Sequence, residues 1–257
     1  MKSSSKPVAE SDKMIFGRQA VLEALKYKRL YQVYVMEGLK GAAINAIVDL
    51  SRQESVPLSF VSRDKFLALV KDYPGHQGVT ALGSSFQYFS LDQLIKTAMA
   101  ASTDPFLLLL DHLQDPQNLG SIIRTADAAG VHGLVIPEPR SVRVTPAVCK
   151  VAAGAVERAR IALVPNLSRA IELLKQDGFW IYGAEADGEV PYYQADFNRP
   201  LALVVGSEGK GLSRIVRKHC DRTVRLPMKE KAASLNVAVA SAVLIYAVLA
   251  QRGKWES

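Results

Sequence analysis

The sequence contains little cysteine, and this scarcity excludes two kinds of protein. Its 257 residues include two cysteines, Cys149 and Cys220, which lie far apart and form no Cys-x-x-Cys pair. A disulfide framework and a zinc site are therefore not expected, and a cytoplasmic location fits best. The four histidines also lack the spacing of metal ligands, so we expect no bound metal.

Long hydrophobic runs are missing as well. The longest apolar stretch, residues 237–250, is interrupted only by Ser241 and falls short of the roughly 18 residues that a transmembrane helix needs. A helix that is apolar nearly all round is typical of a buried core or of a subunit interface, and both remain open. Residues 1–13 are polar and have no apolar segment, so we expect a disordered tail and not a signal peptide.

Negative charge is the scarcer sign in this chain. There are 25 acidic residues against 32 lysines and arginines, which gives a net charge of +7. This excess favours an anionic partner such as nucleic acid. Hydrophobic residues make up 49% of the chain, which is ordinary for a globular protein.

The alternation of helical and strand-like patterns predicts an α/β protein with two domains. Residues 14–85 form a small α/β unit, and residues 86–104 are expected to be a linker that holds a helix capped by Ser90. Residues 105–257 alternate continuously apolar strands with helices, which indicates a mostly parallel sheet covered on both faces. Ligands of such sheets bind beyond the carboxyl ends of the strands, which draws attention to residues 111–124, 206–211 and 226–236.

The first of these three junctions follows the apolar run 106–110 and reads "DPQNLGSIIRTADAAG". A dinucleotide-binding enzyme would place two or three glycines here, whereas this chain has one. Asn118 is a candidate helix cap, and Arg124 lies off the buried stripe of the helix that follows. Taken alone, this stretch is better explained by a solvated arginine beside a capping asparagine than by a functional site.

The second junction, "VVGSEGKGLS", is rich in glycine but does not have the glycine spacing of a phosphate-binding Walker A loop. A tight turn would explain it, except that Glu208 stands between glycines, close to exposed backbone N–H groups. The third junction, "LPMKEKAASLN", ends in Ser234 and Asn236 just before the apolar helix. Helix capping accounts for both residues when this junction is considered alone.

Together the three junctions are specific. "NLG…R", "GSEGKG" and "LPM…SLN" occur in an order and at spacings that resemble the three motifs of the SpoU family of RNA 2′-O-ribose methyltransferases, in the SPOUT superfamily. The segments "IFGRQAVLEAL" and "HQGVTAL" look like the amino-terminal domain of the branch that methylates a guanosine ribose in 23S ribosomal RNA. The resemblance covers about residues 14–252. One departure is Ala238, where many relatives have serine.

This resemblance implies a carboxy-terminal methyltransferase domain whose chain forms a deep trefoil knot, preceded by an RNA-binding domain like ribosomal protein L30e. It also implies a homodimer with the active site near the subunit interface. The implied cofactor is S-adenosylmethionine, and the implied substrate is structured RNA. Transfer RNA is an alternative substrate, and a non-catalytic RNA-binding or ribosome-assembly protein on the same fold is an alternative function.

The resemblance also assigns roles to particular residues. The cofactor contacts that it implies are Gly206, Leu226, Met228, Ser234 and Leu235. Close approach of a ligand to the backbone would explain the glycine at 206. The catalytic residues that it implies are Arg124, Asn118, Glu208, Ser234 and Asn236.

We expect Arg124 to clamp the target ribose or its phosphate. A guanidinium has no acceptor atom and a pKa above about 12, so it is a poor candidate for the base. The remaining catalytic residues are expected to orient Arg124 and the ribose.

Overall fold

The chain forms two compact units in a computed structural model that describes residues 14–26, 30–71, 73–83, 86–207, 209–229 and 235–253. The first unit comprises the described residues up to Gln87 together with Val144–Glu157, and the second comprises Tyr88–Arg143 and the described residues from Arg158 onward. The tail predicted at residues 1–13 lies outside the described part.

The first unit is built on a four-stranded mixed sheet in the order β1-β4-β2-β3, in which only β2 and β3 are parallel. Its strands and helices are β1 (Met14–Phe16), α1 (Arg18–Lys26), β2 (Leu30–Met36), α2 (Ala42–Gln53), β3 (Leu58–Val61), α3 (Arg63–Val70) and β4 (Val79–Gly83). Helix α1 buries Val21, Ala24 and Leu25 in one core cluster, and α3 buries Phe66 and Val70 in a second. The small α/β fold predicted for this region is confirmed.

Helix α6 (Pro146–Ala152) and the three-ten helix η2 (Ala155–Glu157) also belong to the first unit, although they lie in the sequence between strands of the second. Helix α6 packs against β1, and the Lys150 side chain lies on Gly75, where an added Cβ would be 2.4 Å from Cε. The sequence had assigned this segment to the second domain. Helical periodicity identifies a helix but does not say which core it joins.

The second unit is a seven-stranded sheet in the order β7-β6-β5-β10-β8-β11-β9. Its strands are β5 (Phe106–Asp111), β6 (Gly133–Pro137), β7 (Ile161–Val164), β8 (Trp180–Ala184), β9 (Val190–Pro191), β10 (Leu201–Gly206) and β11 (Arg222–Arg225). Every neighbouring pair is parallel, which confirms the predicted mostly parallel sheet. All six residues of β5 are buried, as expected for a strand covered on both faces.

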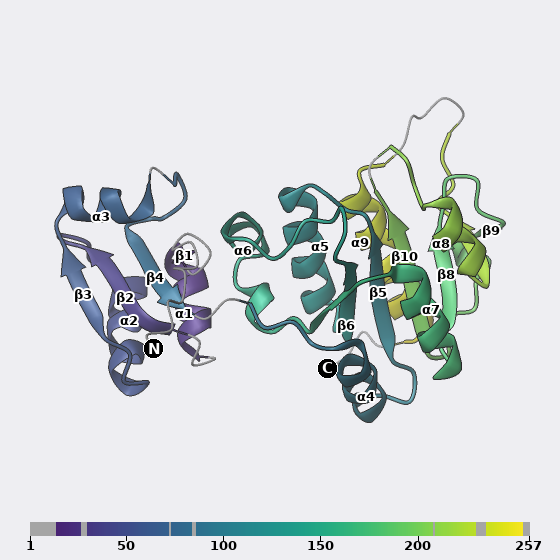
Figure 1. Cartoon of the computed structure of the whole chain (residues 1–257), viewed down its shortest axis with the longest axis horizontal. Helices are drawn as coiled ribbons and strands as arrows, with labels where there is room; N and C mark the ends of the chain where they lie inside the picture. Colours follow the sequence, from purple (N-terminus) through teal and green to yellow (C-terminus); the bar gives the residue numbers. More distant parts are fainter. Residues whose placement is uncertain are drawn as a thin grey trace, which may run out of the picture. The chain divides into compact units, whose positions relative to one another are not determined.

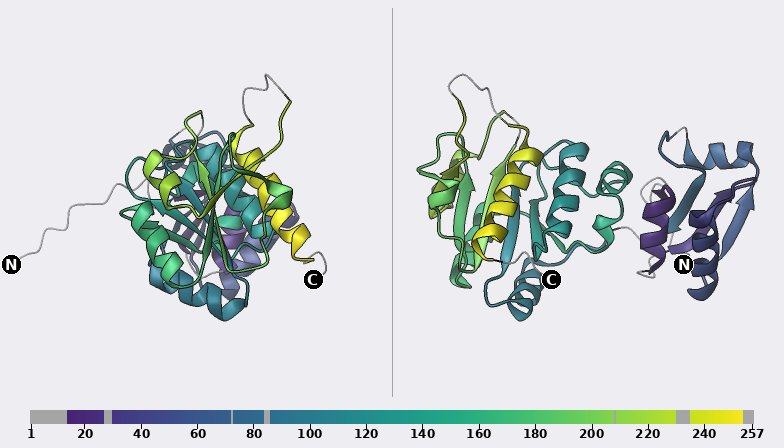
Figure 2. Two further views of the ribbon diagram at one scale, coloured as in Figure 1. Left: turned by 90° about the vertical axis from the view of Figure 1, so that its right-hand side faces the viewer. Right: turned by 180° about the vertical axis from the view of Figure 1, so that it is seen from behind.

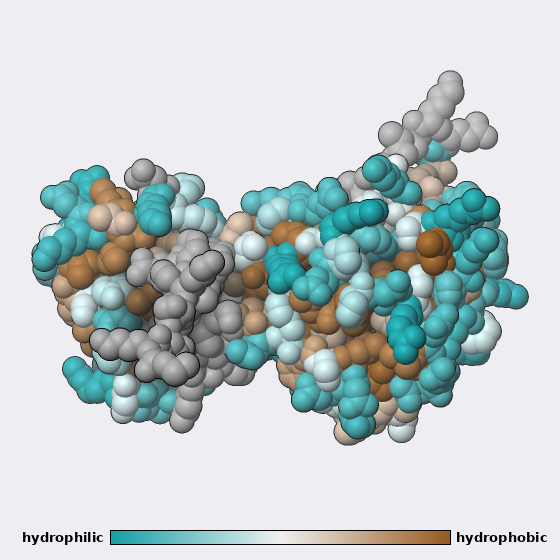
Figure 3. Space-filling model, viewed as in Figure 1, coloured by the Kyte–Doolittle hydropathy of each residue, from teal (hydrophilic) through white to brown (hydrophobic). Residues whose placement is uncertain are grey.

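Helices cover both faces of this sheet (Figures 1 and 2). On one face lie α4 (Leu91–Ala101), α7 (Leu167–Gln176) and α8 (Arg214–His219), whose apolar side chains share one core cluster with the strands. On the other face lie α5 (Pro116–Ala128) and α9 (Val237–Gln251), which pack against each other. A short three-ten helix, η3 (Tyr192–Gln194), precedes β10. Apolar side chains remain visible between hydrophilic ones on the surface of this unit (Figure 3).

Most of the segment expected as a linker, residues 86–104, belongs to the second unit. Helix α4 buries Leu94, Ile95 and Ala98, whose spacing places them on one helix face. Ser90 accepts a hydrogen bond from the Gln93 backbone N–H and forms a capping box, which confirms the predicted cap. An amphipathic helix therefore continues the core here instead of bridging two domains.

Helix α9 has one buried face and one exposed apolar face, so it is not apolar core all round. Val237, Ser241, Leu244, Ile245 and Val248 are buried, whereas three apolar side chains on another face are 40–51% exposed, namely Val239, Val243 and Tyr246. Among the described helices, none is long and apolar enough to cross a membrane. The deep trefoil knot stays a prediction, because residues 230–234 of the loop before α9 lie outside the described part.

Candidate functional site

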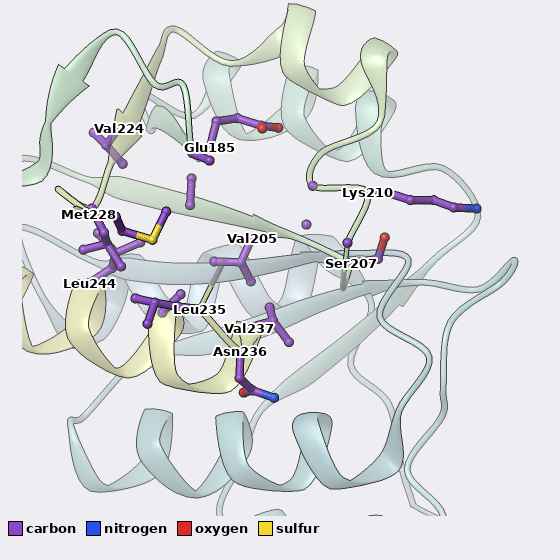
Figure 4. Close-up of a pocket in the computed structure, with 17 residues that line it drawn as sticks. Glu185, Val205, Ser207, Lys210, Val224, Met228, Leu235, Asn236, Val237 and Leu244 are labelled. Carbon is purple, nitrogen blue, oxygen red and sulfur yellow. The ribbon is translucent and has the colours of Figure 1, made fainter. Parts of the chain in front are cut away.

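A pocket of about 540 Å³ lies at the carboxyl ends of the central strands of the second unit. Its walls come from the ends of β8, β10 and β11, from the turn after β10 and from the start of α9 (Figure 4). The described residues that line it are Ala184, Glu185, Ala186, Val205, Gly206, Ser207, Gly209, Lys210, Gly211, Val224, Leu226, Met228, Leu235, Asn236, Val237, Ala240 and Leu244. A mostly aliphatic cavity with few polar groups is typical of a small-molecule site.

Four of the five residues predicted to contact a cofactor line this one pocket: Gly206, Leu226, Met228 and Leu235. They come from the second and third predicted junctions, whereas no residue of the first junction, 111–124, is among the described residues of this wall. The fifth, Ser234, lies outside the described residues, as does Glu208. The ends of β10 and β11 meet at the same edge of the parallel sheet, and the start of α9 lies beside them.

The turn after β10, which lines this pocket, closes on itself. The backbone N–H of Ser207 donates to the Gly211 carbonyl at 3.2 Å, and the N–H of Gly211 donates to the Ser207 carbonyl at 3.1 Å. A Cβ added at Gly206 would lie 2.1 Å from the Gly211 carbonyl carbon. The glycine at 206 is therefore required by the turn's own backbone, whereas the sequence argument attributed it to a ligand.

Glu185 is a pocket residue that the sequence argument missed. One of its oxygens, Oε1, accepts a hydrogen bond at 2.8 Å from the backbone N–H of Leu212, which holds the end of the turn. It is the only acidic side chain among the described residues of the pocket wall. Glu185 directly follows β8, so the rule that ligands bind beyond strand ends could have identified it.

Asn118 and Asn236 meet through their side chains. The Nδ2 of Asn236 donates to the Oδ1 of Asn118 at 3.0 Å, and the Asn236 Oδ1 accepts from the backbone N–H groups of Ala238 and Val239. Asn236 thus caps α9 as predicted, and it also joins that helix to α5 (Figure 4).

Asn118 is not the cap of α5, contrary to the sequence argument. That cap is Asp115, which accepts a hydrogen bond at 2.9 Å from the Gln117 backbone N–H and precedes Pro116 at the first helical position. Proline at that position is a strong helix-start signal, which places Asn118 three residues inside the helix. Its side chain is buried and accepts a hydrogen bond from Asn236, the cap of α9.

Within one chain, Arg124 is not among the described residues that line the pocket. It lies six residues beyond Asn118 on α5, which places it about 9 Å further along the helix and about 120° around it. Its side chain is exposed, and it forms no hydrogen bond or ion pair with any residue that the structure describes. Asn118 and Arg124 therefore face different surroundings.

Two other chemistries find no support in the site. Within the described ranges no group of three or more histidine, cysteine or acidic side chains could hold a metal ion. Burial raises the pKa of the Cys220 thiol to about 12, so this side chain is protonated at neutral pH and unsuited to act as a nucleophile.

Comparison with known proteins identifies both units. Residues 105–246 match the model of the SpoU rRNA Methylase family, and residues 14–89 match the RNA 2′-O ribose methyltransferase substrate-binding domain. YacO of Bacillus subtilis (strain 168), assigned to the TrmH family of tRNA/rRNA methyltransferases, is 41% identical over 239 residues, which cover 93% of this chain and 95% of YacO.

Solved structures agree in fold. The SpoU methyltransferase AviRb from Streptomyces viridochromogenes, solved with AdoMet, has a TM-score of 0.80 at 24% identity and covers 95% of this chain and 91% of its own. An RNA 2′-O ribose methyltransferase has a TM-score of 0.76 at 26% identity and covers 94% of this chain and 90% of its own.

Proposed function

The chain belongs to the SpoU family of RNA methylases, and from this premise we propose that it transfers the methyl group of S-adenosylmethionine to a ribose 2′-hydroxyl of RNA. The observation that carries the proposal is the convergence of Gly206, Leu226, Met228 and Leu235 on one pocket. The family membership favours an enzyme over a non-catalytic RNA-binding protein, and over a dinucleotide-dependent enzyme.

The pocket fits the proposed cofactor in its chemistry. Aliphatic side chains from Leu226, Leu235 and Leu244 offer a surface for a purine ring, and the Glu185 carboxylate offers an acceptor for hydroxyl or ammonium groups. When bound, S-adenosylmethionine supplies an electrophilic methyl group on a sulfonium sulfur. The turn at 206–211 and the start of α9 line the pocket and would hold this group there.

The protein's contribution to the reaction is largely positional. An in-line transfer needs the ribose oxygen, the methyl carbon and the sulfur collinear, with the reacting atoms roughly 3–3.5 Å apart. We assign Asn236 and Asn118 to orienting the ribose, because their side chains bond to each other at the pocket edge. Arg124 clamps the ribose or its phosphate and stabilises negative charge on the 2′-oxygen, since a guanidinium cannot accept the proton. The phosphate would accept the 2′-hydroxyl proton, and loss of the methyl group would leave a neutral thioether as the second product. Glu208 and Ser234 are proposed to assist in this orientation.

We further propose that the active enzyme is a homodimer and that Arg124 acts on the pocket of the second copy. Two observations support this arrangement. Arg124 and Asn118 lie on different sides of α5, and α9 exposes a stripe formed by Val239, Val243 and Tyr246 beside α5. A stripe of this kind is typical of a subunit interface.

Mixing two inactive variants tests the dimer. Arg124→Ala and Asn236→Ala chains are co-expressed with different tags, and the mixed dimers are purified through both tags. If the two residues serve one site from different chains, a mixed dimer keeps one intact site of its two, or about half the activity of the wild-type dimer. Mixed dimers as inactive as their parents would contradict the arrangement.

The proposed substrate is a guanosine of 23S ribosomal RNA, and the proposed location is the cytoplasm. The amino-terminal unit, proposed to be L30e-like, would hold the RNA. Transfer RNA is the alternative, since YacO is assigned to a family of tRNA/rRNA methyltransferases.

The decisive assay incubates the protein and labelled S-adenosylmethionine with unmodified 23S ribosomal RNA and unmodified transfer RNA, followed by mass spectrometry. We expect a single 2′-O-methylated guanosine in the ribosomal RNA and none with the Asn236→Ala variant. A base-methylated product, or no transfer to either RNA, would contradict the proposed function. Methylation of transfer RNA alone would replace the substrate and keep the reaction.

A further inference from the structure

We infer that a second, charged pocket beside the first binds a backbone phosphate of the RNA substrate. This pocket has a volume of about 310 Å³. Its described lining residues are Asp111, His112, Gln114, Arg140, Ser207, Lys210, Gly211, Leu212 and Ser213. The inference rests on the proposed function, because it concerns how the same RNA is held.

The cations of this pocket are not engaged elsewhere. Neither Arg140 nor Lys210 forms a hydrogen bond or ion pair with any residue in the described part of the chain. Other arginines of this unit are paired: Arg143 donates to Glu138 at 2.6 Å, and Arg217 donates to Asp187 at 3.2 Å. A guanidinium and an ammonium that pair with none of the described residues, on one cavity wall, match the phosphate group in charge and geometry.

The one acidic side chain of the described pocket wall already has hydrogen-bond partners within the protein. Asp111 is 1% exposed, and its Oδ2 accepts a hydrogen bond at 2.6 Å from the backbone N–H of Ser213. Its Oδ1 lies 2.5 Å from the Nδ1 of His112. Asp111 thus holds two parts of the wall in place and leaves the Nε2 of His112 as a further polar group for a ligand.

Two strained backbone positions face the same cavity. His112 and Arg140 have φ angles of 56° and 58°, and they are two of six non-glycine residues with positive φ in the described chain. The backbone N–H of Val142 donates to the Leu113 carbonyl at 2.8 Å, which ties the two strained loops together. Strain of this kind costs roughly 1–3 kcal/mol and concentrates at functional sites, because the surrounding structure must hold it.

The position of the pocket identifies the anion. Ser207, Lys210 and Gly211 line both cavities, so the 206–211 turn is their common wall. In Figure 4 the Lys210 side chain points away from the apolar side chains of the first pocket. A nucleotide whose sugar reaches the methyl donor at one side of this turn carries its phosphates a short distance away, and the second pocket lies there to receive one of them.

The test compares Arg140 with its neighbour Arg143. RNA binding is measured for Arg140→Gln, Lys210→Gln and the control Arg143→Gln as a function of salt, with unmodified 23S ribosomal RNA as the probe. Loss of one phosphate contact should weaken binding on the order of tenfold and reduce the slope of log K against log salt by about one. We expect this for Arg140→Gln and Lys210→Gln, no change for Arg143→Gln, and recovery of the slope in Arg140→Lys.

A second variant separates charge from backbone strain. Arg140→Gly removes the guanidinium but relieves the positive φ, so it should reduce the slope of log K against log salt by about one while the protein stays folded. The affinity of Arg140→Gln for S-adenosylmethionine should remain that of the wild type.

The failure of this inference can be told from the failure of the proposed function. An RNA methyltransferase whose Arg140→Gln and Lys210→Gln variants bind RNA with the wild-type salt slope would overturn the phosphate pocket and leave the enzyme standing. A wild-type protein that transfers no methyl group to RNA would overturn both.

Discussion

The two pockets of the carboxy-terminal unit share a wall and differ in almost everything else. The larger is lined by aliphatic side chains and backbone, with a single acidic side chain among its described residues. The smaller is lined by Arg140, Lys210, His112 and a buried aspartate. The first suits a small, mostly apolar ligand held by shape, and the second suits an anion held by charge.

One short turn therefore forms part of two pockets that suit different ligands, a small apolar molecule and an anion. Residues 206–211 close through two backbone hydrogen bonds, and side chains behind the turn hold it from both sides. Glu185 holds the N–H of Leu212, and Asp111 holds the N–H of Ser213. The following experiments perturb the shared wall first and then the individual pockets.

The largest expected effect comes from Gly206→Ala, which should damage both pockets at once. The new Cβ would lie 2.1 Å from the Gly211 carbonyl carbon, and backbone at this distance cannot move aside without opening the turn. We expect a loss of about 3 kcal/mol in the free energy of unfolding. Displacement of the turn should also cost about 1.4 kcal/mol or more in the free energy of S-adenosylmethionine binding, which weakens binding by more than about tenfold. Urea denaturation and calorimetry measure the two quantities.

Gly209→Ala is the matched control for that experiment. An added Cβ at Gly209 meets no atom within 4 Å, although its φ of 74° is unfavourable for alanine. Its cost should stay near 1 kcal/mol. Equal losses in the two variants would show that the contact between Gly206 and Gly211 does not matter.

The second effect concerns the edge of the larger pocket, where Asn236 caps α9 and bonds to Asn118. Asn236→Ala removes both functions and should cost about 2 kcal/mol, from the lost cap and from the lost hydrogen bond to Asn118. Asn236→Ser keeps a capping oxygen but cannot reach Asn118, so it should lose about half as much stability. Both variants should lose methyl transfer, and a fully active Asn236→Ser enzyme would remove the orienting role.

The third effect is confined to the larger pocket. Leu235 is 45% exposed and lines its wall, so Leu235→Ala should change the free energy of unfolding by less than about 0.5 kcal/mol. Each methylene that the ligand buries against the protein contributes about 0.8 kcal/mol. Because Leu235→Ala removes part of this contact, the dissociation constant for S-adenosylmethionine should rise roughly fivefold. RNA affinity should not change. Leu173→Ala on α7, also partly exposed at 39%, provides the control, and an equal change in cofactor affinity there would contradict a specific contact.

The smallest effect tests the packing behind the turn, where Cys220 adjoins the main core cluster. Burial raises the pKa of its thiol from 9.0 to about 12, so the unfolded chain releases this proton at a lower pH than the folded chain does. The associated stability is present below pH 9 and declines between pH 9 and about 12. At pH 10 this group should account for roughly 1 kcal/mol of lost stability.

Unfolding is therefore compared at pH 8 and pH 10 in the wild type and in Cys220→Ala. The variant should show the smaller decline. An identical decline in the wild type and Cys220→Ala would mean that the thiol is not desolvated as the structure indicates.

Much of this molecule follows from local sequence pattern. Continuously apolar runs such as residues 106–110 predict strands that are covered on both faces, and helical spacing predicts α1, α4 and α5. Because parallel strands end at one edge, the sequence also predicts that residues 111–124, 206–211 and 226–236 lie near one another. Four of the predicted cofactor positions do lie on one pocket, although their chemical roles remain a proposal.

Other features depend on contacts between distant residues, which periodicity does not record. Only the tertiary structure pairs Asn236 with Asn118 and assigns α6 to the amino-terminal unit. It also separates Arg124 from the pocket that the motif order suggests it serves. A sequence determines which faces are apolar and where elements begin, because these depend on neighbours a few residues away. The packing of those elements determines which polar groups meet, since that depends on side chains more than a hundred residues apart.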